Sequence, residues 1–276
     1  MNLISRFFGI SVIFFLLLVI SSGCLDENGE PDEVTIELSG STTVFPIGKA
    51  AADEYMKNND HVSIIISAGG SGVGIKDAAS GKSDIGMASR DLKDSEKTDY
   101  PGLRTIRIGD DGLSIVVHEE NPLTELTLDQ VKKVFLGEIT NWSELGWENE
   151  TIIPVGRDAE SGTRGAFDEL VLDDAEPSSS MLEKSSNGLV FTEVKDSRYS
   201  IGYIGLGYVD KGVKPLKIDG ISPTISTVQG GTYPISRPLN FVTKGEPKGE
   251  VKKFIDFMIS SDGQQIVEEQ DFVPIK

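Results

Sequence analysis

Three short stretches rich in serine, threonine and glycine each join a strand-like apolar run to a helical pattern. The apolar runs that precede them, such as residues 62–67, are rich in β-branched side chains. Strands that alternate with helices predict an α/β architecture with largely parallel sheets. Of the features of this sequence, the alternation of strand and helix patterns constrains the fold most. The three stretches are residues 39–46, 68–74 and 157–164.

Each stretch is placed at the start of a helix, where the first N–H groups have no intrahelical partner and the helix dipole is positive. Such a position attracts anions, and the hydroxyl groups of Ser71, Ser161 and Thr163 add further donors. One Ser-Gly-Thr sequence alone is equally consistent with an ordinary helix cap. Three junctions of the same kind favour a shared anion site.

The N-terminus predicts secretion. Arg6 precedes a continuous apolar run over residues 7–20, which ends in small residues before Cys24. This pattern indicates a signal peptide over residues 1–23, and Cys24 resembles the lipidated first residue of a mature lipoprotein. The alternative is an uncleaved membrane anchor. Either one places the protein outside the cytoplasmic membrane, with residues 24–33 as a solvated linker.

Composition excludes several classes of function. The net charge of -18 argues against a nucleic-acid surface, although screening limits its influence on a buried ligand site. A single cysteine excludes a disulfide within the chain. The two histidines, His61 and His118, lie near no nucleophile motif, so the sequence supports neither a catalytic triad nor a metal site. We therefore expect no enzyme and no cofactor; a hydrolase using Ser71 or Ser161 is the weak alternative.

Further elements follow from periodicity. Helices are expected over residues 128–135, 187–194 and 251–259, strands over 113–117 and 201–205, and an extended crossing segment over 234–242. Residues 84–88 predict a short strand that ends at Ser89 and Arg90. The side chain of Arg90 either lies on the surface or faces the ligand, and the sequence leaves both open.

At these residues the chain resembles the phosphate-binding lipoproteins of ABC phosphate transporters. The matching segments are residues 40–46, 69–74 and 84–90, together with Arg157 and residues 161–163, and they span most of the mature chain. The resemblance implies a two-lobed periplasmic-binding-protein fold with two crossing hinge strands and the ligand between the lobes. Applied here, lobe one comprises residues 34–112 and 237–276, and lobe two comprises residues 113–236.

The resemblance also implies a set of ligand contacts from both lobes, some through backbone N–H groups. Arg157 is expected to be the charged ligand, whereas Arg164 is expected near the rim or beside an acidic neighbour. Well-known members place an acidic residue after the short strand to accept the proton of hydrogen phosphate. Ser89 and Arg90 stand there instead, so the acceptor is unassigned. The expected contacts are Thr42, Thr43, Val44, Phe45, Ser71, Ser89, Arg90, Arg157, Ser161, Gly162 and Thr163.

The function implied is capture of inorganic phosphate outside the membrane and delivery to an ABC transporter permease by lobe closure. A lipid anchor at Cys24 would hold the protein, a monomer, at the membrane. Two alternatives stay open at this point. One is another tetrahedral oxyanion, namely sulfate, molybdate or tungstate, and the other is phosphate sensing with a membrane partner.

Overall fold

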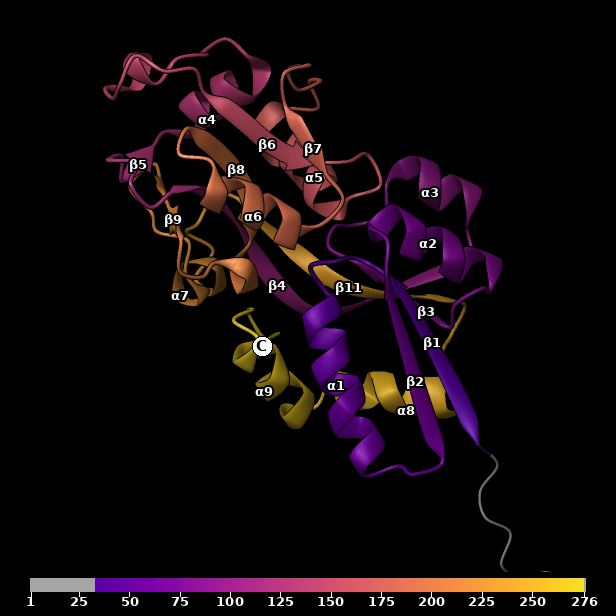
Figure 1. Cartoon of the computed structure of the whole chain (residues 1–276). Coiled ribbons are helices and arrows are strands. Elements are labelled where there is room, and N and C mark those ends of the chain that lie inside the picture. The colour runs from indigo at the N-terminus through magenta and orange to yellow at the C-terminus, as the bar shows by residue number, and fades with distance from the viewer. Residues whose placement is uncertain (1–32, 276) are drawn as a thin grey trace, which may run out of the picture. The chain divides into compact units, whose positions relative to one another are not determined.

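The long strand β4 (Leu103–His118) runs through both halves of the main sheet (Figure 1). Its first part pairs with β11 (Ser236–Lys244), and its last part pairs with β8 (Ser200–Gly205) and β9 (Val213–Pro215). All of these pairings are antiparallel. The computed structural model describes residues 33–275.

The outer strands of the main sheet are parallel, but its centre is not. Strand order is β2-β1-β3-β11-β4-β8-β6-β7, with β9 on β4, and a separate pair β10-β5. The expectation of largely parallel sheets is therefore wrong at β4 and β11. The chain leaves the first half through β4 and returns through β11, so the two run in opposite directions. The remaining strands are β1 (Val34–Gly40), β2 (Val62–Ala68), β3 (Ile85–Ala88), β5 (Glu125–Leu126), β6 (Ile153–Arg157), β7 (Leu182–Lys184) and β10 (Lys217–Ile218).

Helices follow most strands, as the periodicity predicts, and their ends have local causes. In α4 the Thr127 side chain accepts from the Gln130 N–H, and Gly137 ends the helix in a left-handed conformation. The α-helices are α1 (Phe45–Lys57), α2 (Ser71–Ser80), α3 (Asp94–Asp99), α4 (Leu128–Leu136), α5 (Gly162–Phe167), α6 (Asn187–Asp196), α7 (Ile225–Gln229), α8 (Gly249–Met258) and α9 (Ser261–Glu269). Short 3-10 helices are η1 (Trp142–Leu145) and η3 (Leu206–Tyr208), and η2 (Asp168–Leu172) is a π-helix.

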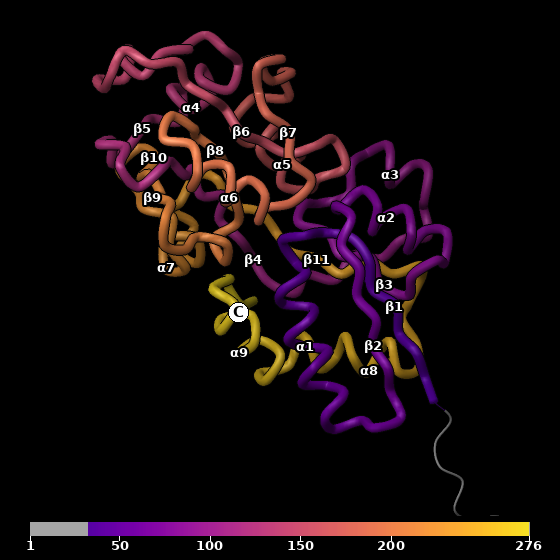
Figure 2. Tube along the Cα trace, in the orientation of Figure 1, coloured from indigo at the N-terminus to yellow at the C-terminus, as the bar shows by residue number. Residues whose placement is uncertain are grey.

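Two large hydrophobic clusters each include residues of the crossing strands. One contains Ile36, Ile47 and Phe241 together with Phe254 of α8, so the C-terminal helices pack with the first strands. The other is built mainly from the middle of the chain and includes the buried Trp142. Figure 2 shows the C-terminal trace returning beside α1. Burying each large apolar side chain contributes about 1.5 to 3 kcal/mol, so each cluster stabilises its own half.

The predicted signal peptide, Cys24 and most of the linker lie outside the described residues. In the part of the chain that the structure describes, no helix combines the length and the apolar character needed to cross a membrane.

Candidate anion-binding site

The polar junctions meet at the ends of their strands. Thr43, between β1 and α1, has its hydroxyl oxygen 3.1 Å from that of Thr163 in α5. Ser71 Oγ, at the start of α2, accepts from the backbone N–H of Ser89 at 3.0 Å, and the two serine hydroxyls are 3.4 Å apart. All four side chains are buried. Residues 120 positions apart in the sequence thus form one cluster of hydroxyl groups.

Gly162 allows this close approach. A Cβ atom at position 162 would lie 2.0 Å from Ser71 Oγ and 2.7 Å from Ser89 Oγ. Any side chain would therefore displace both serines, and only glycine lets α5 reach α2 and the end of β3.

Arg157, the last residue of β6, brings a positive charge that has no acidic hydrogen-bond partner in the described part of the chain. Its Nε donates to the Lys184 carbonyl at 3.0 Å, and its Nη2 donates to the Ser185 carbonyl at 2.9 Å. Its Nη1 is buried and has no hydrogen-bond partner among residues 33–275. Burial lowers the pKa of Arg157 to about 10, because the charged form is poorly solvated. An anion at Nη1 would satisfy both the charge and the orphan donor.

The guanidinium of Arg164 is paired with acidic side chains. Its Nε donates to both carboxylate oxygens of Asp168, at 2.8 and 2.7 Å, and its Nη1 donates to Glu183 at 3.3 Å. Nη1 also donates to the Arg157 carbonyl at 3.1 Å, so the Arg164 guanidinium supports the strand that carries Arg157.

Several expected backbone donors are used within their own loops. The N–H groups of Thr43 and Val44 donate to Ser41 Oγ at 3.2 and 3.3 Å, and that of Phe45 donates to the Ser41 carbonyl at 3.1 Å. Ser161 accepts from the N–H groups of Thr163 and Arg164, so its side chain caps α5. In these loops the hydroxyl hydrogens remain as donors, whereas the N–H groups named here are engaged.

The structure does not bring the guanidinium of Arg90 to the hydroxyl cluster. Its Nη1 and Nη2 each donate to Glu96 at 2.7 Å, and Nη1 also donates to the Asp91 carbonyl at 2.8 Å. The reason is local, because α3 places Glu96 six residues after Arg90. Burial alone would raise the pKa of Glu96, but the hydrogen bonds from Arg90 and the Lys93 N–H lower it below its usual value.

Three buried polar residues at the cluster were missed by the sequence reasoning. Arg237 of β11 donates to Thr43 Oγ1 at 3.1 Å and to Ser89 Oγ at 3.3 Å. Asn187, at the start of α6, donates to the hydroxyls of Thr42 and Thr43 at 3.2 and 2.9 Å. Asp111 of β4 accepts from Arg237. A charged residue inside an apolar strand, as Arg237 is, was the available signal, since charges are rarely buried without a partner.

Asp111 is the carboxylate nearest to these donors in the bonding network, yet its oxygens are engaged. Oδ2 accepts from Arg237 Nε and Nη2 at 3.0 and 2.7 Å, and Oδ1 accepts from the Leu206 N–H at 2.9 Å. Burial raises the pKa of Asp111, and the Arg237 charge opposes that rise. The cluster therefore offers hydroxyl and guanidinium donors. Within residues 33–275 no group of three or more His, Cys, Asp or Glu side chains is arranged to hold a metal ion.

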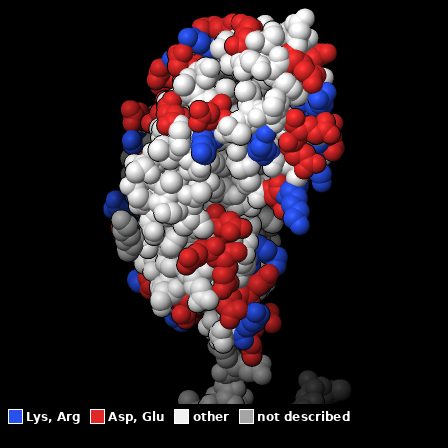
Figure 3. Space-filling model, turned by 90° about the vertical axis from the view of Figure 1, so that its left-hand side faces the viewer, with Lys and Arg blue, Asp and Glu red and all other residues white. Residues whose placement is uncertain are grey.

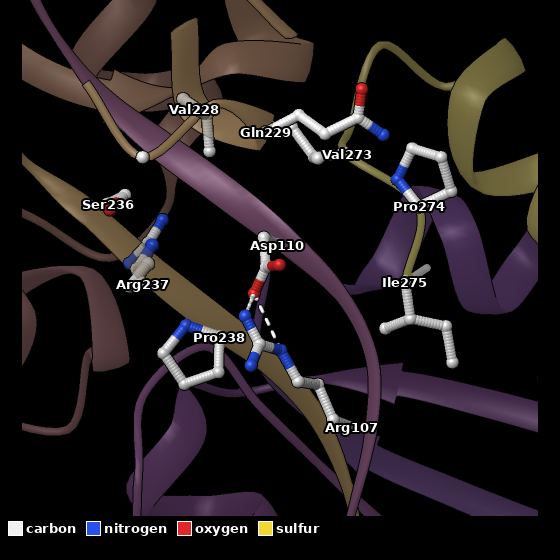
Figure 4. Close-up of a pocket in the computed structure, with 11 residues that line it drawn as sticks. Arg107, Asp110, Val228, Gln229, Ser236, Arg237, Pro238, Val273, Pro274 and Ile275 are labelled. Carbon is white, nitrogen blue, oxygen red and sulfur yellow. Dashed lines mark hydrogen bonds and ion pairs between the residues drawn. The ribbon is translucent and has the colours of Figure 1, made fainter. Parts of the chain in front are cut away.

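A separate cavity of about 570 Å³ lies beside the crossing strands (Figure 4). Strand residues Ser236 and Pro238 line it together with the C-terminal Pro274 and Ile275. Its ion pair joins Arg107 Nε to Asp110 Oδ1 at 2.8 Å. These polar groups are already paired with each other, unlike Nη1 of Arg157.

The surface reflects the net charge of -18. On the face drawn in Figure 3, Asp and Glu side chains gather in patches, while Lys and Arg side chains are scattered between them. The Arg157, Asp111 and Arg237 side chains are buried. The charge presented to solvent on this face is thus opposite in sign to the buried charge of Arg157.

The chain is similar to known proteins along most of its length. The model of the PBP superfamily domain matches residues 26–262. Phosphate-binding protein PstS of Bacillus subtilis is 35% identical over 243 residues, covering 87% of this chain and 81% of the relative. Phosphate-binding protein PstS of Borreliella burgdorferi is 32% identical over 277 residues, covering 96% and 99%. A crystal structure with bound phosphate, of a Clostridium perfringens protein assigned as a phosphate ABC transporter substrate-binding protein, has a TM-score of 0.85 and 40% identity, covering 88% and 100%.

Proposed function

Because the chain belongs to the PstS family of phosphate-binding proteins within the PBP superfamily, we propose that it captures inorganic phosphate and delivers it to an ABC transporter permease. The relatives carry the name of phosphate-binding proteins, and this chain is accordingly a binding protein that acts outside the cytoplasmic membrane rather than an enzyme. The observation that carries the ligand assignment is the buried Nη1 of Arg157, which has no partner in the described chain and belongs to the same set of junctions as the hydroxyl cluster.

The proposed phosphate contacts are the hydroxyls of Thr43, Ser71, Ser89 and Thr163 and the guanidinium of Arg157. Hydrogen bonds to an ionised group contribute about 1.5 to 3 kcal/mol each, and an arginine can pair with phosphate through two of them. Thr42, Val44, Phe45, Ser161 and Gly162 then act by shaping the loops around the anion. This division of roles is supported by the internal hydrogen bonds of Ser41 and Ser161.

We further propose that two lobes, residues 34–112 with 237–276 and residues 113–236, close over the anion. The two hydrophobic clusters support this division, because each is drawn from one of these sets apart from Val273. Contacts between the sets support closure. The Gly72 N–H donates to the Glu160 carbonyl at 3.0 Å, and Lys76 pairs with the Glu160 carboxylate at 2.8 Å.

Lipidation of Cys24 would tether the protein outside the cytoplasmic membrane, near its permease. The apolar run before Cys24 supports this proposal. A monomer suffices for the function, since both proposed lobes belong to one chain.

Titration calorimetry with phosphate, sulfate, molybdate and tungstate tests the ligand. We expect phosphate to bind most tightly, with one site per chain. Tight sulfate binding with no phosphate binding would overturn the assignment. Sulfate is the informative competitor, because the cluster presents donors and the Asp111 carboxylate is occupied by Arg237.

A further inference from the structure

Arg237 and Asp111 form a buried pair where the crossing strands meet the hydroxyl cluster. They are direct partners in the register of β11 and β4. One edge of the Arg237 guanidinium, Nε with Nη2, donates to Asp111 Oδ2 at 3.0 and 2.7 Å. The other donors reach Thr43 Oγ1 and Ser89 Oγ. The carboxylate therefore fixes the orientation of the guanidinium, and the guanidinium contacts two separate loops.

The hydroxyl of Thr43 has no lone pair left for a further donor. A hydroxyl group accepts two hydrogen bonds and donates one. Arg237 Nη2 donates to Thr43 Oγ1 at 3.1 Å, and Asn187 Nδ2 donates to it at 2.9 Å. The orientation of the Asn187 amide follows from the Gly205 N–H, which donates to Asn187 Oδ1 at 3.3 Å. Both acceptor positions of Thr43 are thus filled by N–H groups.

The hydrogen of Thr43 must then point away from Arg237 and Asn187. Thr163 Oγ1 lies 3.1 Å from Thr43 Oγ1, so the Thr43 hydrogen can be donated either to Thr163 or to an anion oxygen beside it. On the other side, Ser89 Oγ accepts from Arg237 Nη1 at 3.3 Å. One buried arginine thus donates to the hydroxyl oxygens of both Thr43 and Ser89.

We propose that Arg237, oriented by Asp111 and assisted by Asn187, is a positioning residue that holds the Thr43 and Ser89 hydroxyls as donors toward the bound anion. This inference rests on the proposed phosphate binding. Arg237 acts through the two hydroxyls, whereas Arg157 offers a donor of its own. An oxyanion oxygen can only accept hydrogen bonds. A hydroxyl whose acceptor positions are filled by N–H groups is held as a donor, so it does not have to be reoriented when the anion binds.

A double-mutant cycle on phosphate affinity separates this role from a general structural one. Arg237→Met is combined with Asp111→Asn, so that no buried carboxylate is left without its partner. Phosphate affinity is measured by calorimetry for the Arg237→Met/Asp111→Asn variant, for Thr43→Val and for the variant that carries all three substitutions. We expect each of the first two to weaken phosphate binding about ten- to a hundredfold. The loss in the combined variant is expected to be at least about tenfold smaller than the product of the two separate losses.

The matched control is the other ion pair of the crossing strands. Arg107→Met with Asp110→Asn leaves phosphate affinity within about twofold of the wild type and combines with Thr43→Val as a simple product. Asn187→Ala provides a second route to the same hydroxyl, and its loss is also expected to be smaller in the Thr43→Val background. It keeps the test valid if the substituted pair fails to fold.

The outcomes are distinct. If the wild-type protein binds no phosphate, the proposed function fails and this inference fails with it. If the wild type binds phosphate but the losses multiply in both cycles, the function stands and Arg237 has no positioning role through Thr43.

Discussion

Two Arg–Asp ion pairs on the crossing strands have the same chemistry but differ in burial. Asp110 and Asp111 are adjacent in β4, so their side chains point to opposite faces of the strand. Asp110 faces the cavity of Figure 4 and pairs with Arg107, with side chains 20% and 58% exposed. Asp111 pairs with Arg237 on the side of the hydroxyl cluster, with side chains 0% and 1% exposed.

Burial, rather than the pairing itself, determines how much stability is lost when one partner of an ion pair is removed. An exposed pair is screened by water and contributes about 0 to 1 kcal/mol. A buried pair gains little over apolar side chains of the same size, but removing one partner leaves a charge that water cannot reach. We therefore expect substitutions on the two faces of β4 to have very different effects.

The largest effect is expected for Asp111→Ala. It leaves the Arg237 guanidinium buried without a carboxylate, and we expect the free energy of unfolding to fall by about 3 to 5 kcal/mol. Denaturant unfolding measures this change. A loss below about 1 kcal/mol would show that Arg237 finds another partner or water, and that the two faces are alike.

Arg157, whose guanidinium has no carboxylate partner among residues 33–275, extends the comparison to ligand binding. Arg157→Met is expected to lower phosphate affinity by about a hundredfold, because it removes charge-assisted hydrogen bonds to the anion. Arg164→Met, which removes a guanidinium held by Asp168 and Glu183, is expected to lower it by less than about tenfold. Calorimetry compares the two, and the reverse ranking would show that the charged ligand is misassigned.

An intermediate case is Arg90–Glu96, whose side chains are 9% and 14% exposed. The pKa of Glu96 is lowered in the folded state, so its contribution is present above the ordinary carboxyl pKa and is lost as the pH falls through the lowered value. Glu96→Gln is expected to cost about 1.5 kcal/mol at neutral pH. Unfolding curves of wild type and variant should converge in acid; a constant difference at every pH would contradict the linkage.

The smallest effect is expected on the outer face. Asp110→Ala removes the carboxylate of an exposed pair, and we expect the free energy of unfolding to change by less than about 1 kcal/mol. Its backbone bonds to Val273 remain, at 2.7 and 2.9 Å. The same unfolding assay as for Asp111→Ala checks it, and an equal loss in both variants would remove the distinction between the faces.

Much of the local structure was predictable because it depends on neighbours in the sequence. The periodicity of residues 128–135 and 251–259 predicts α4 and α8, since one apolar face of each helix must be buried. The junctions at Ser71 and Thr163 were predictable from strand-like runs followed by hydroxyl residues. The antiparallel centre of the sheet was not, because strand direction depends on how distant segments pair.

The sequence by itself determined the strand–loop–helix units and the resemblance to phosphate-binding proteins, and it predicts different roles for Arg157 and Arg164. Tertiary structure decided which donors are free. It brings Arg237, Asp111 and Asn187 to Thr43 from three distant elements. Hydrogen bonds of this kind depend on distances between segments that only packing brings together, and no local pattern encodes them.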